Sequence, residues 1–423
     1  MKYEQEYINI LNEELKKAMG CTEPICISYL STILRDQLAN IPTKVDIYVS
    51  GNILKNVKSV VVPNTKGLRG IKAAVAIGVI GGIQDLKLEC LTYVNEMHRD
   101  ACVKFVEDTD ITIYSTDDGF IFDVHIIMSD GENEVEGRIV DNHTNVVYLR
   151  KNDEIIINRP LVNVRKIHDL TDHSVLNVED IYKFAEECDI DKVRDLIEGQ
   201  IKCNMMIAEE GLKNNYGANI GKTLLKTYPV DVAVKAKAYA AAASDARMNG
   251  CELPVVINSG SGNQGITCSV PVVIYALELN VSHEKLLRAL VLSNLLTARI
   301  KTGIGRLSAF CGAVAAGCAA GASIAYLHGG DLKMISHTLV NSLAIVSGII
   351  CDGAKASCAA KIASSIDAGI LGFKLYQQGN QFYSGDGIVS KGVENTINNV
   401  GILASQGMVS TDKEIINIML NTK

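Results

Sequence analysis

The chain has 423 residues, of which 48% are hydrophobic and 21% charged, which is typical of a globular protein with a large core and excludes a disordered chain. This length predicts two domains, or one large domain with an insertion. The 41 basic and 48 acidic residues give a net charge of −7, and no basic block alternates with aromatic residues, so we expect no nucleic-acid partner.

The cysteines and the N-terminal residues indicate the cellular compartment in which we expect the protein. The first 20 residues have the charged, amphipathic pattern of a helix and lack the apolar region of a signal peptide, so we expect a cytoplasmic protein. Twelve cysteines without a secretion signal favour free thiols over a disulfide framework. No two of them have C-x-x-C spacing, which argues against zinc ribbons and thioredoxin-like chemistry.

The N-terminal part of the chain predicts helices followed by an α/β unit. In residues 1–40, apolar positions such as Leu11, Leu15 and Met19 recur at helical spacing, and we assign these helices to a large helical domain. Residues 41–170 predict an inserted α/β domain.

The inserted domain is expected to begin with strands and to end in a β-meander. Alternating or β-branched runs predict strands at 44–51 and 58–63, and a glycine-punctuated helix follows at 66–82. Residues 110–157 then predict a β-meander, with hairpin turns at Asp118-Gly119 and Asp130-Gly131.

Residues 171–423 nearly lack strand patterns and predict successive helices rich in Ala and Gly. The predicted fold class is therefore α+β: a large Ala/Gly-rich all-helical domain with an inserted smaller α/β domain. Residues 307–330 contain no Asp, Glu, Lys or Arg, and their length would permit a membrane span. Because they are Ala, Gly, Ser and Cys rather than large apolar residues, we expect a packed core helix and no membrane contact.

A glycine-rich segment at 258–265 reads NSGSGNQG and contains the pattern G-x-G-x-x-G. A dinucleotide site would need a helix to start at the third glycine, whereas Ile266 to Pro271 disfavour one, and the surroundings are helical rather than βαβ. We instead expect a nest of backbone N–H groups for a small carboxylic acid. Polar side chains in the segment suit such a ligand; they are Ser259, Ser261, Asn263 and Gln264. A simple tight turn is the alternative.

A second glycine motif, GANIGKT at 217–223, is rejected as a nucleotide loop. A Walker A loop has four residues between its first glycine and the Gly-Lys pair, and this segment has three.

Three cysteines late in the chain indicate a cluster site. Thiolates are the usual ligands of iron–sulfur clusters, and the three are Cys311, Cys351 and Cys358. On an unbroken helix the last two would be about 10 Å apart, but Asp352-Gly353 predicts a break between them. Three thiolates would leave one iron with an open position, as in other catalytic metal sites. The alternative is three buried core cysteines.

Cys21 lies in the segment MGCTEPICISY, where Gly20 is expected to end the first helix and Pro24 suits the start of the next. A thiol at a helix N-terminus has a lowered pKa, which favours a role as a base or as a fourth iron ligand. Glu23 is either part of this site or an ordinary acidic residue of a first helical turn.

Several motifs together resemble one family. They are GCTEPI near the start, SGN at 50–52, ASDARMNGCELPVVINSGSGNQGI, GRLSAFCGA and ICDGAKASCA. In combination they are similar to the L-cysteine desulfidase family, which is related to the α-chain of iron–sulfur L-serine dehydratases. The resemblance covers essentially the whole chain. It implies a [4Fe-4S] lyase that needs no pyridoxal phosphate and converts L-cysteine to pyruvate, ammonia and hydrogen sulfide.

The resemblance also implies roles for individual residues. The cluster would be held by Cys311, Cys351 and Cys358, and Cys21 would remove the α-proton or bind the fourth iron transiently. The substrate would be bound by the glycine-rich segment and by residues of two shorter motifs; these are Ser261, Asn263, Gln264, Ser50, Asn52 and His143.

The other cysteines bear on the number of cluster ligands. Serine dehydratases of this type usually supply a fourth cysteine from the C-terminus, and no cysteine follows Cys358 here, which favours an open iron and the desulfidase activity. Cys268 and Cys318 lie near the motifs but are not expected to be ligands.

Three alternatives to the desulfidase therefore remain open. An iron–sulfur L-serine dehydratase is the nearest alternative, since the two substrates differ in one atom. A non-enzymatic iron–sulfur amino-acid sensor is a different class, against which the lack of a basic patch argues; a membrane transporter would rest only on 307–330. We expect a small amino-acid substrate and a homodimer.

Overall fold

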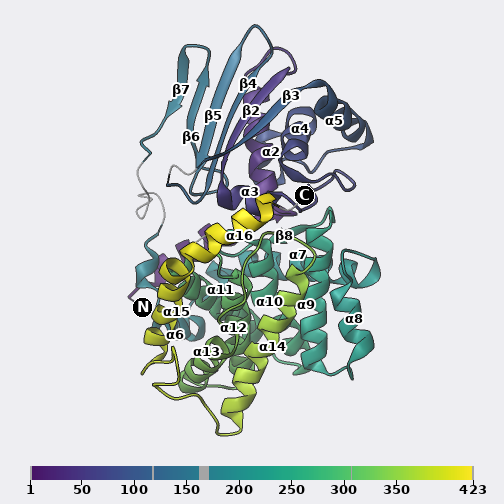
Figure 1. The fold of residues 1–423 in the computed structure, drawn as a ribbon. Coiled ribbons are helices and arrows are strands. Elements are labelled where there is room, and N and C mark those ends of the chain that lie inside the picture. The colour runs from purple at the N-terminus through teal and green to yellow at the C-terminus, as the bar shows by residue number, and fades with distance from the viewer. Residues whose placement is uncertain (1, 117–118, 162–170, 306, 422–423) are drawn as a thin grey trace.

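The computed structural model describes residues 2–116, 119–161, 171–305 and 307–421. A mixed β-sheet with its own helices forms one half of the molecule, and a body of packed helices forms the other (Figure 1). The predicted α+β class is confirmed.

The large sheet has the strand order β3-β2-β4-β5-β6-β7. Its strands are β2 (Lys44–Ser50), β3 (Asp110–Thr116), β4 (Asp123–Ser129), β5 (Glu134–Val140), β6 (Val146–Lys151) and β7 (Glu154–Asn158). The β-meander is confirmed from β4 to β7, with Gly131 at φ +95° in the turn after β4. The prediction that β3 pairs with β4 is wrong, because β2 lies between them and runs parallel to β3. Of the predicted turn between them, Asp118 lies outside the described residues.

One face of the sheet packs on α2 (Thr22–Arg35), and α4 (Gly70–Gly81) packs on α2. The two helices approach closely: a Cβ on Gly78 would lie 2.3 Å from the carbonyl oxygen of Ser28. Hydroxyl groups bond across this contact, since Ser28 Oγ donates to the carbonyl of Ala74 at 2.7 Å. The remaining helices of this half are α3 (Gly51–Val57), η1 (Gln84–Glu89) and α5 (Glu96–Asp108).

The strand predicted at 58–63 is wrong. These residues follow α3, and their only ladder contact among the described residues is an isolated bridge between Val61 and Arg69. Val60 and Val62 are fully buried, so their side chains fill the core without a strand partner.

The helix predicted through Met19 is also shorter than expected. α1 (Glu4–Glu14) ends early, and β1 (Lys17–Met19) pairs antiparallel with β8 (Pro254–Val256). Gly20 follows at φ +48°, where a Cβ would lie 2.1 Å from Pro63 Cγ. α1 contacts the helical body, whereas α2 lies against the sheet, so the first 40 residues contribute to both halves.

The helical body surrounds α12 (Gly312–Leu327), which contacts α10, α11, α13 and α14. Small residues permit this packing, since a Cβ on Gly321 would lie 2.4 Å from the carbonyl oxygen of Gly369. The other elements of the body are η2 (His173–Val175), α6 (Val178–Glu187), η3 (Ile190–Lys192), α7 (Arg194–Lys213), α8 (Ile220–Thr227), α9 (Val232–Met248), α10 (Gly262–Glu278), α11 (His283–Ile304), α13 (Leu332–Val346), α14 (Cys358–Gln377), α15 (Val393–Ile402) and η4 (Leu403–Gly407).

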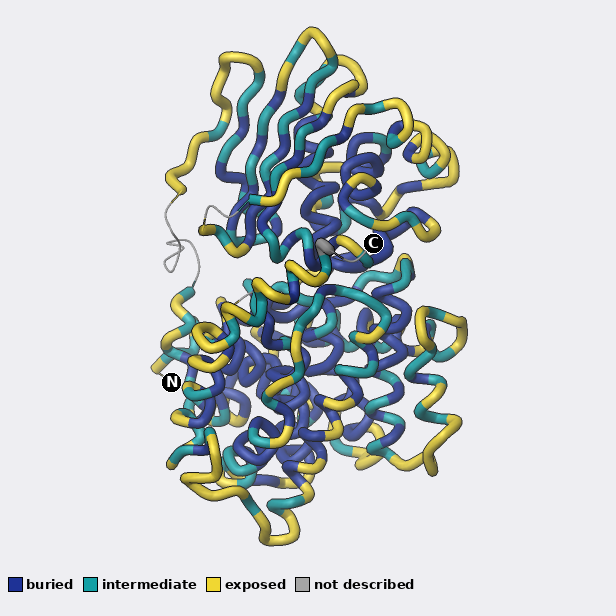
Figure 2. The backbone as a smooth tube through the Cα atoms, viewed as in Figure 1, coloured by how far each residue is buried: buried dark blue, intermediate teal, exposed yellow. Residues whose placement is uncertain are grey.

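The charge-free stretch is confirmed as a core helix, with residues 313–327 of α12 all buried (Figure 2). Within the described residues, the structure contains no helix with the length and apolarity that a membrane crossing requires.

The expectation of no regular helix after the glycine-rich segment is wrong, because α10 starts at Gly262 and includes Pro271. Its β-branched residues are buried against α9, α11 and α12, so tertiary packing overrides their low helix propensity. The rejection of a dinucleotide fold holds for another reason. The strand before this segment, β8, pairs antiparallel with β1 and belongs to no parallel sheet.

The last helix, α16 (Val409–Asn421), crosses between the two halves (Figure 1). Asp412 on this helix accepts a bond from Lys55 Nζ at 2.6 Å and another from Asn52 Nδ2 at 2.9 Å, both on α3. The ion pair therefore joins the C-terminal helix to the sheet half.

Candidate active site

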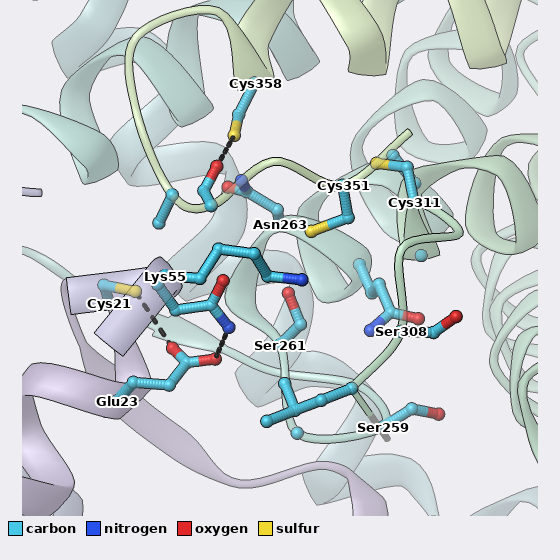
Figure 3. Close-up of a pocket in the computed structure, with 18 of the residues that line it drawn as sticks. Cys21, Glu23, Lys55, Ser259, Ser261, Asn263, Ser308, Cys311, Cys351 and Cys358 are labelled. Carbon is cyan, nitrogen blue, oxygen red and sulfur yellow. Dashed lines mark hydrogen bonds between the residues drawn. The ribbon is translucent and has the colours of Figure 1, made fainter. Parts of the chain in front are cut away.

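One cavity between the two halves collects most of the predicted site residues (Figure 3). Those that line it are Cys21, His143, Ser259, Ser261, Asn263, Gln264, Cys311, Cys351 and Cys358. Segments separated by more than 300 residues thus meet at one place.

Ser50 and Asn52 do not line this cavity. They line a larger, adjoining cavity that shares Phe122, Leu307 and Ser308 with the first. Ser50 Oγ donates to the carbonyl of Ile121 at 2.8 Å, and Asn52 bonds to Asp412.

Four helices begin at the first cavity. Cys21 is the N-cap of α2, Ser261 of α10 and Cys311 of α12, while Cys358 is the first residue of α14. The N-terminal end of a helix carries a partial positive charge and unsatisfied N–H groups. The cavity is therefore suited to thiolates and carboxylates.

The three late cysteines differ from the other nine. Cys311, Cys351 and Cys358 are partly exposed, whereas all the others are buried. Cys311 and Cys351 lie on adjacent segments, because Cys311 N–H donates to the carbonyl of Ile349 at 3.0 Å and Cys351 N–H donates to the carbonyl of Ala309 at 2.6 Å. Their partial exposure at the cavity favours a ligand role over that of three buried core cysteines.

The predicted break between Cys351 and Cys358 is confirmed. Residues 351–357 are non-helical, and Gly353 has φ +92°. A Cβ on Gly353 would lie 2.3 Å from the carbonyl oxygen of Lys55, so only glycine fits where this loop meets α3.

Three thiols that line one cavity are donors of the type that iron–sulfur clusters use. Burial, together with the neighbouring Cys351 and Cys358, raises the pKa of the Cys311 thiol to about 12, as expected for thiols that crowd one another. Within the described ranges, no three His, Cys, Asp or Glu side chains are arranged to hold one metal ion. In a cubane each cysteine binds a different iron atom, so three thiolates around a shared cavity are suitable ligands.

Cys21 is hydrogen-bonded to Glu23, at the left of Figure 3, whereas Cys311 lies at the right. Its Sγ donates to Glu23 Oε2 at 3.0 Å, and Asn56 Nδ2 donates to Glu23 Oε1 at 3.0 Å. Cys21 is also part of a small apolar cluster against which Cys358 packs.

The predicted lowering of the Cys21 pKa is wrong. Burial raises the pKa of Cys21 well above its ordinary value, and the Glu23 carboxylate raises it further. Burial also raises the pKa of Glu23, but the opposing effects of His143, the Cys21 hydrogen bond and Arg247 leave that pKa below its ordinary value. The pair therefore holds one proton at rest, on sulfur.

A buried hydrogen-bond network supports the glycine-rich segment. Ser259 has a left-handed φ of +49°, and its Oγ donates to Asn258 Oδ1 at 2.8 Å. Asn258 Nδ2 donates in turn to Asn294 Oδ1 at 2.9 Å, and Asn294 also bonds to Gln200. This buried amide network fixes a strained turn at the cavity wall, as is common at functional sites.

Gln264 lies in the first turn of α10 and is 3% exposed. Its Oε1 has no hydrogen-bond partner among the described residues, and an unpartnered buried polar atom is costly. A Cβ on Gly312 would lie 2.6 Å from Gln264 Cδ, so glycine beside Cys311 makes room for this amide.

Sequence reasoning missed several residues that line the cavity; they are Lys55, Asn56, Arg247 and Lys301. Arg247 could have been noticed in the sequence, because it is a charged residue near the end of the Ala-rich segment that forms α9. In the structure its side chain is 2% exposed. The other three lie in helices whose sequences give no sign that these side chains face a cavity.

Comparisons with known proteins identify the family of this chain. Residues 57–417 match the family model of the serine dehydratase alpha chain. A UPF0597 protein of Desulfitobacterium hafniense is 56% identical over 420 residues, which covers 99% of this chain and 97% of that protein. UPF0597 proteins of Lachnoclostridium phytofermentans and Treponema denticola are 48% and 46% identical, with at least 98% of each chain covered. The chain therefore belongs to the serine dehydratase alpha-chain family.

Proposed function

We propose that this protein is a [4Fe-4S] lyase that eliminates hydrogen sulfide from L-cysteine and yields pyruvate and ammonia. Membership of the serine dehydratase alpha-chain family supports an amino-acid lyase of the iron–sulfur type. The observation that carries the proposal is the meeting of three partly exposed cysteines, a Cys–Glu proton pair and an unpartnered buried amide at one cavity.

The cluster would be held by Cys311, Cys351 and Cys358, with Cys21 nearby as a fourth thiol. When bound, it would supply a Lewis-acidic iron for the leaving atom of the substrate, with a preference for sulfur over oxygen.

The chain's own residues bind and orient the amino acid. The starts of α10 and α12 present N–H groups and positive dipole ends that suit the carboxylate. Gln264 Oε1 offers an acceptor for the α-ammonium group. Fixing both groups holds the Cα–H bond in one direction, which lowers the entropic barrier to proton removal.

Cys21 and Glu23 would move the proton. The Sγ proton passes to Glu23 Oε2, 3.0 Å away, and the thiolate then takes the α-proton of the substrate. The raised pKa of Cys21 makes this first transfer unfavourable, but it also makes the thiolate a strong base. A strong base is needed because the α-proton of an amino acid is weakly acidic. The electron pair left on Cα then forms the Cα–Cβ double bond and expels the substrate sulfur as hydrosulfide, which takes the proton held by Glu23 and leaves as hydrogen sulfide. The aminoacrylate formed in this way hydrolyses in water to pyruvate and ammonia.

A second candidate is L-serine dehydration by the same steps. The family match favours it, because the matching family is described by that substrate. The two activities differ only in the leaving atom, and the same residues would bind either substrate.

The test is pyruvate release from L-cysteine and from L-serine by protein reconstituted with iron and sulfide under anaerobic conditions. We expect release from L-cysteine that is abolished in Cys351→Ala but retained in Cys318→Ala, a buried cysteine on α12 that does not line the cavity. Release from serine alone would establish the dehydratase. Absence of pyruvate from either, with an intact cluster, would contradict both lyases and favour an amino-acid sensor.

A further inference from the structure

A buried arginine at the cavity is the starting point. Arg247 is 2% exposed, lines the cavity and lies close to the start of α10, since a Cβ on Gly262 would be 2.2 Å from Arg247 Nε. Glycine at this position is what admits the guanidinium beside the helix N-terminus. Two sources of positive charge therefore coincide there.

The hydrogen bonds of Arg247 go to neutral groups. Nη1 donates to Asn263 Oδ1 at 3.0 Å and lies 4.0 Å from Met248 Sδ. Nε has no partner in the described part of the chain. The Glu23 carboxylate lies near enough to act on this charge but accepts no hydrogen bond from Arg247 among the described residues. The side edge of a guanidinium, here with an unpartnered Nε, is shaped to receive a carboxylate through two parallel bonds.

A second unpartnered atom among the residues that line the same cavity completes the pattern. Gln264 Oε1 is the second unpartnered polar atom among the cavity-lining residues of α9 and α10, and it is an acceptor where Arg247 Nε is a donor. An α-amino acid carries one negative carboxylate and one donating ammonium group. The two orphaned atoms are complementary to these two groups.

Accordingly, we propose that Arg247 is the residue that binds the α-carboxylate of the substrate, with its Nε edge, while Gln264 accepts from the α-ammonium. This assignment rests on the proposed amino-acid lyase activity. It adds the residue that makes the site specific for substrates with an α-carboxylate. It predicts that a free carboxylate is required for tight binding, so that amines lacking it are poor ligands.

Two small thiols test the binding of the carboxylate and of the ammonium group separately. 3-Mercaptopropionate has the carboxylate without the ammonium, and cysteamine has the ammonium without the carboxylate. Their dissociation constants would be measured by isothermal titration calorimetry on cluster-loaded wild-type protein and on Arg247→Gln. We expect the Kd of 3-mercaptopropionate to rise roughly 10- to 100-fold in the variant, with little change for cysteamine.

Controls distinguish binding from general damage. Arg299→Gln removes another mostly buried arginine, one that is ion-paired with Glu394 and lines neither cavity, and it should change neither Kd. Iron content and circular dichroism report cluster loss and misfolding. If Arg247→Gln does not fold, Arg247→Lys keeps the charge but loses the paired geometry, and should weaken 3-mercaptopropionate selectively.

Equal weakening of both thiols in a folded, cluster-loaded variant would overturn the assignment and indicate that Arg247 only balances local charge. An unchanged Kd for 3-mercaptopropionate would overturn it too. Pyruvate formation by the wild-type protein is measured separately, so failure of the lyase activity is distinguishable from failure of this assignment.

Discussion

Cys21 and Glu23 show how two side chains set each other's chemistry. The Glu23 carboxylate accepts hydrogen bonds from Cys21 and Asn56, and it remains ionised in a buried site. The same carboxylate raises the pKa of the Cys21 thiol, so each residue determines the protonation state of the other. Neither side chain by itself would be an effective base for the substrate α-proton.

Removal of either member should therefore disable proton transfer. We expect Cys21→Ser and Glu23→Gln each to lower kcat by roughly 10²- to 10⁴-fold. Because the two act as a unit, the double variant should be little worse than either single variant. Steady-state pyruvate formation measures all three.

Cys26→Ala provides the control for this prediction. Cys26 is a fully buried thiol on the same helix and does not line the cavity, so its loss should leave kcat nearly unchanged. Multiplicative losses in the double variant would show that Cys21 and Glu23 act independently.

Among the elements, α12 and α14 owe their close approach to glycine. Gly317 and Gly321 face Ser365 and Gly369, and a Cβ at any of these glycines would lie within 2.6 Å of backbone on the other helix. This contact matters for the site because Cys311 is the N-cap of α12 and Cys358 is the first residue of α14. The close packing of these two helices therefore determines the separation of two proposed cluster ligands.

Gly321→Ala should lower the free energy of unfolding by about 1–3 kcal/mol, because a methyl group there has no space. Gly199→Ala is the matched control, since Gly199 is also inside a helix, α7, and a Cβ there would meet nothing within 4 Å. That change should raise the same free energy by roughly 0.5–1 kcal/mol, through the better helix propensity of Ala. Urea unfolding compares the two, and equal effects would contradict the packing argument.

Across the whole molecule, the cavity exists because two halves of the chain meet. Glu23, Lys55 and His143 come from the sheet half, while the cavity-lining cysteines at the starts of α12 and α14 come from the helical body. The ion pair between Lys55 and Asp412 ties α16 to this boundary at 2.6 Å, with the Lys55 side chain only 1% exposed.

Asp412→Ala should destabilise the protein by roughly 3–5 kcal/mol, because it leaves the buried Lys55 ammonium unpaired. Lys413→Ala, at the exposed neighbouring position, should have little effect. Unfolding midpoints report stability, and hydrogen exchange should show faster exchange in α16 for Asp412→Ala alone. Similar exchange in both variants would show that the ion pair does not hold this helix.

Some features of the fold follow from short-range sequence pattern. The alternation of β4 to β7 and the Asp130-Gly131 turn predict a meander, since both depend on neighbouring residues. The placement of β2 between β3 and β4 depends on a parallel pairing across more than 60 residues, which local pattern does not encode. The helix over Gly262–Glu278 was missed for a similar reason, because burial rather than propensity stabilises it.

The sequence by itself determined the candidate residues: its motifs named the three cysteines, Cys21 and the glycine-rich segment, which are the residue types that a cluster and a small carboxylic acid would require. Only the tertiary structure decided which residues share a cavity. It brought in Arg247 and Lys55, placed Ser50 and Asn52 in an adjoining cavity, and reversed the expected pKa of Cys21. The physical reason is that burial and distances between remote charges depend on packing, which residue spacing along the chain does not specify.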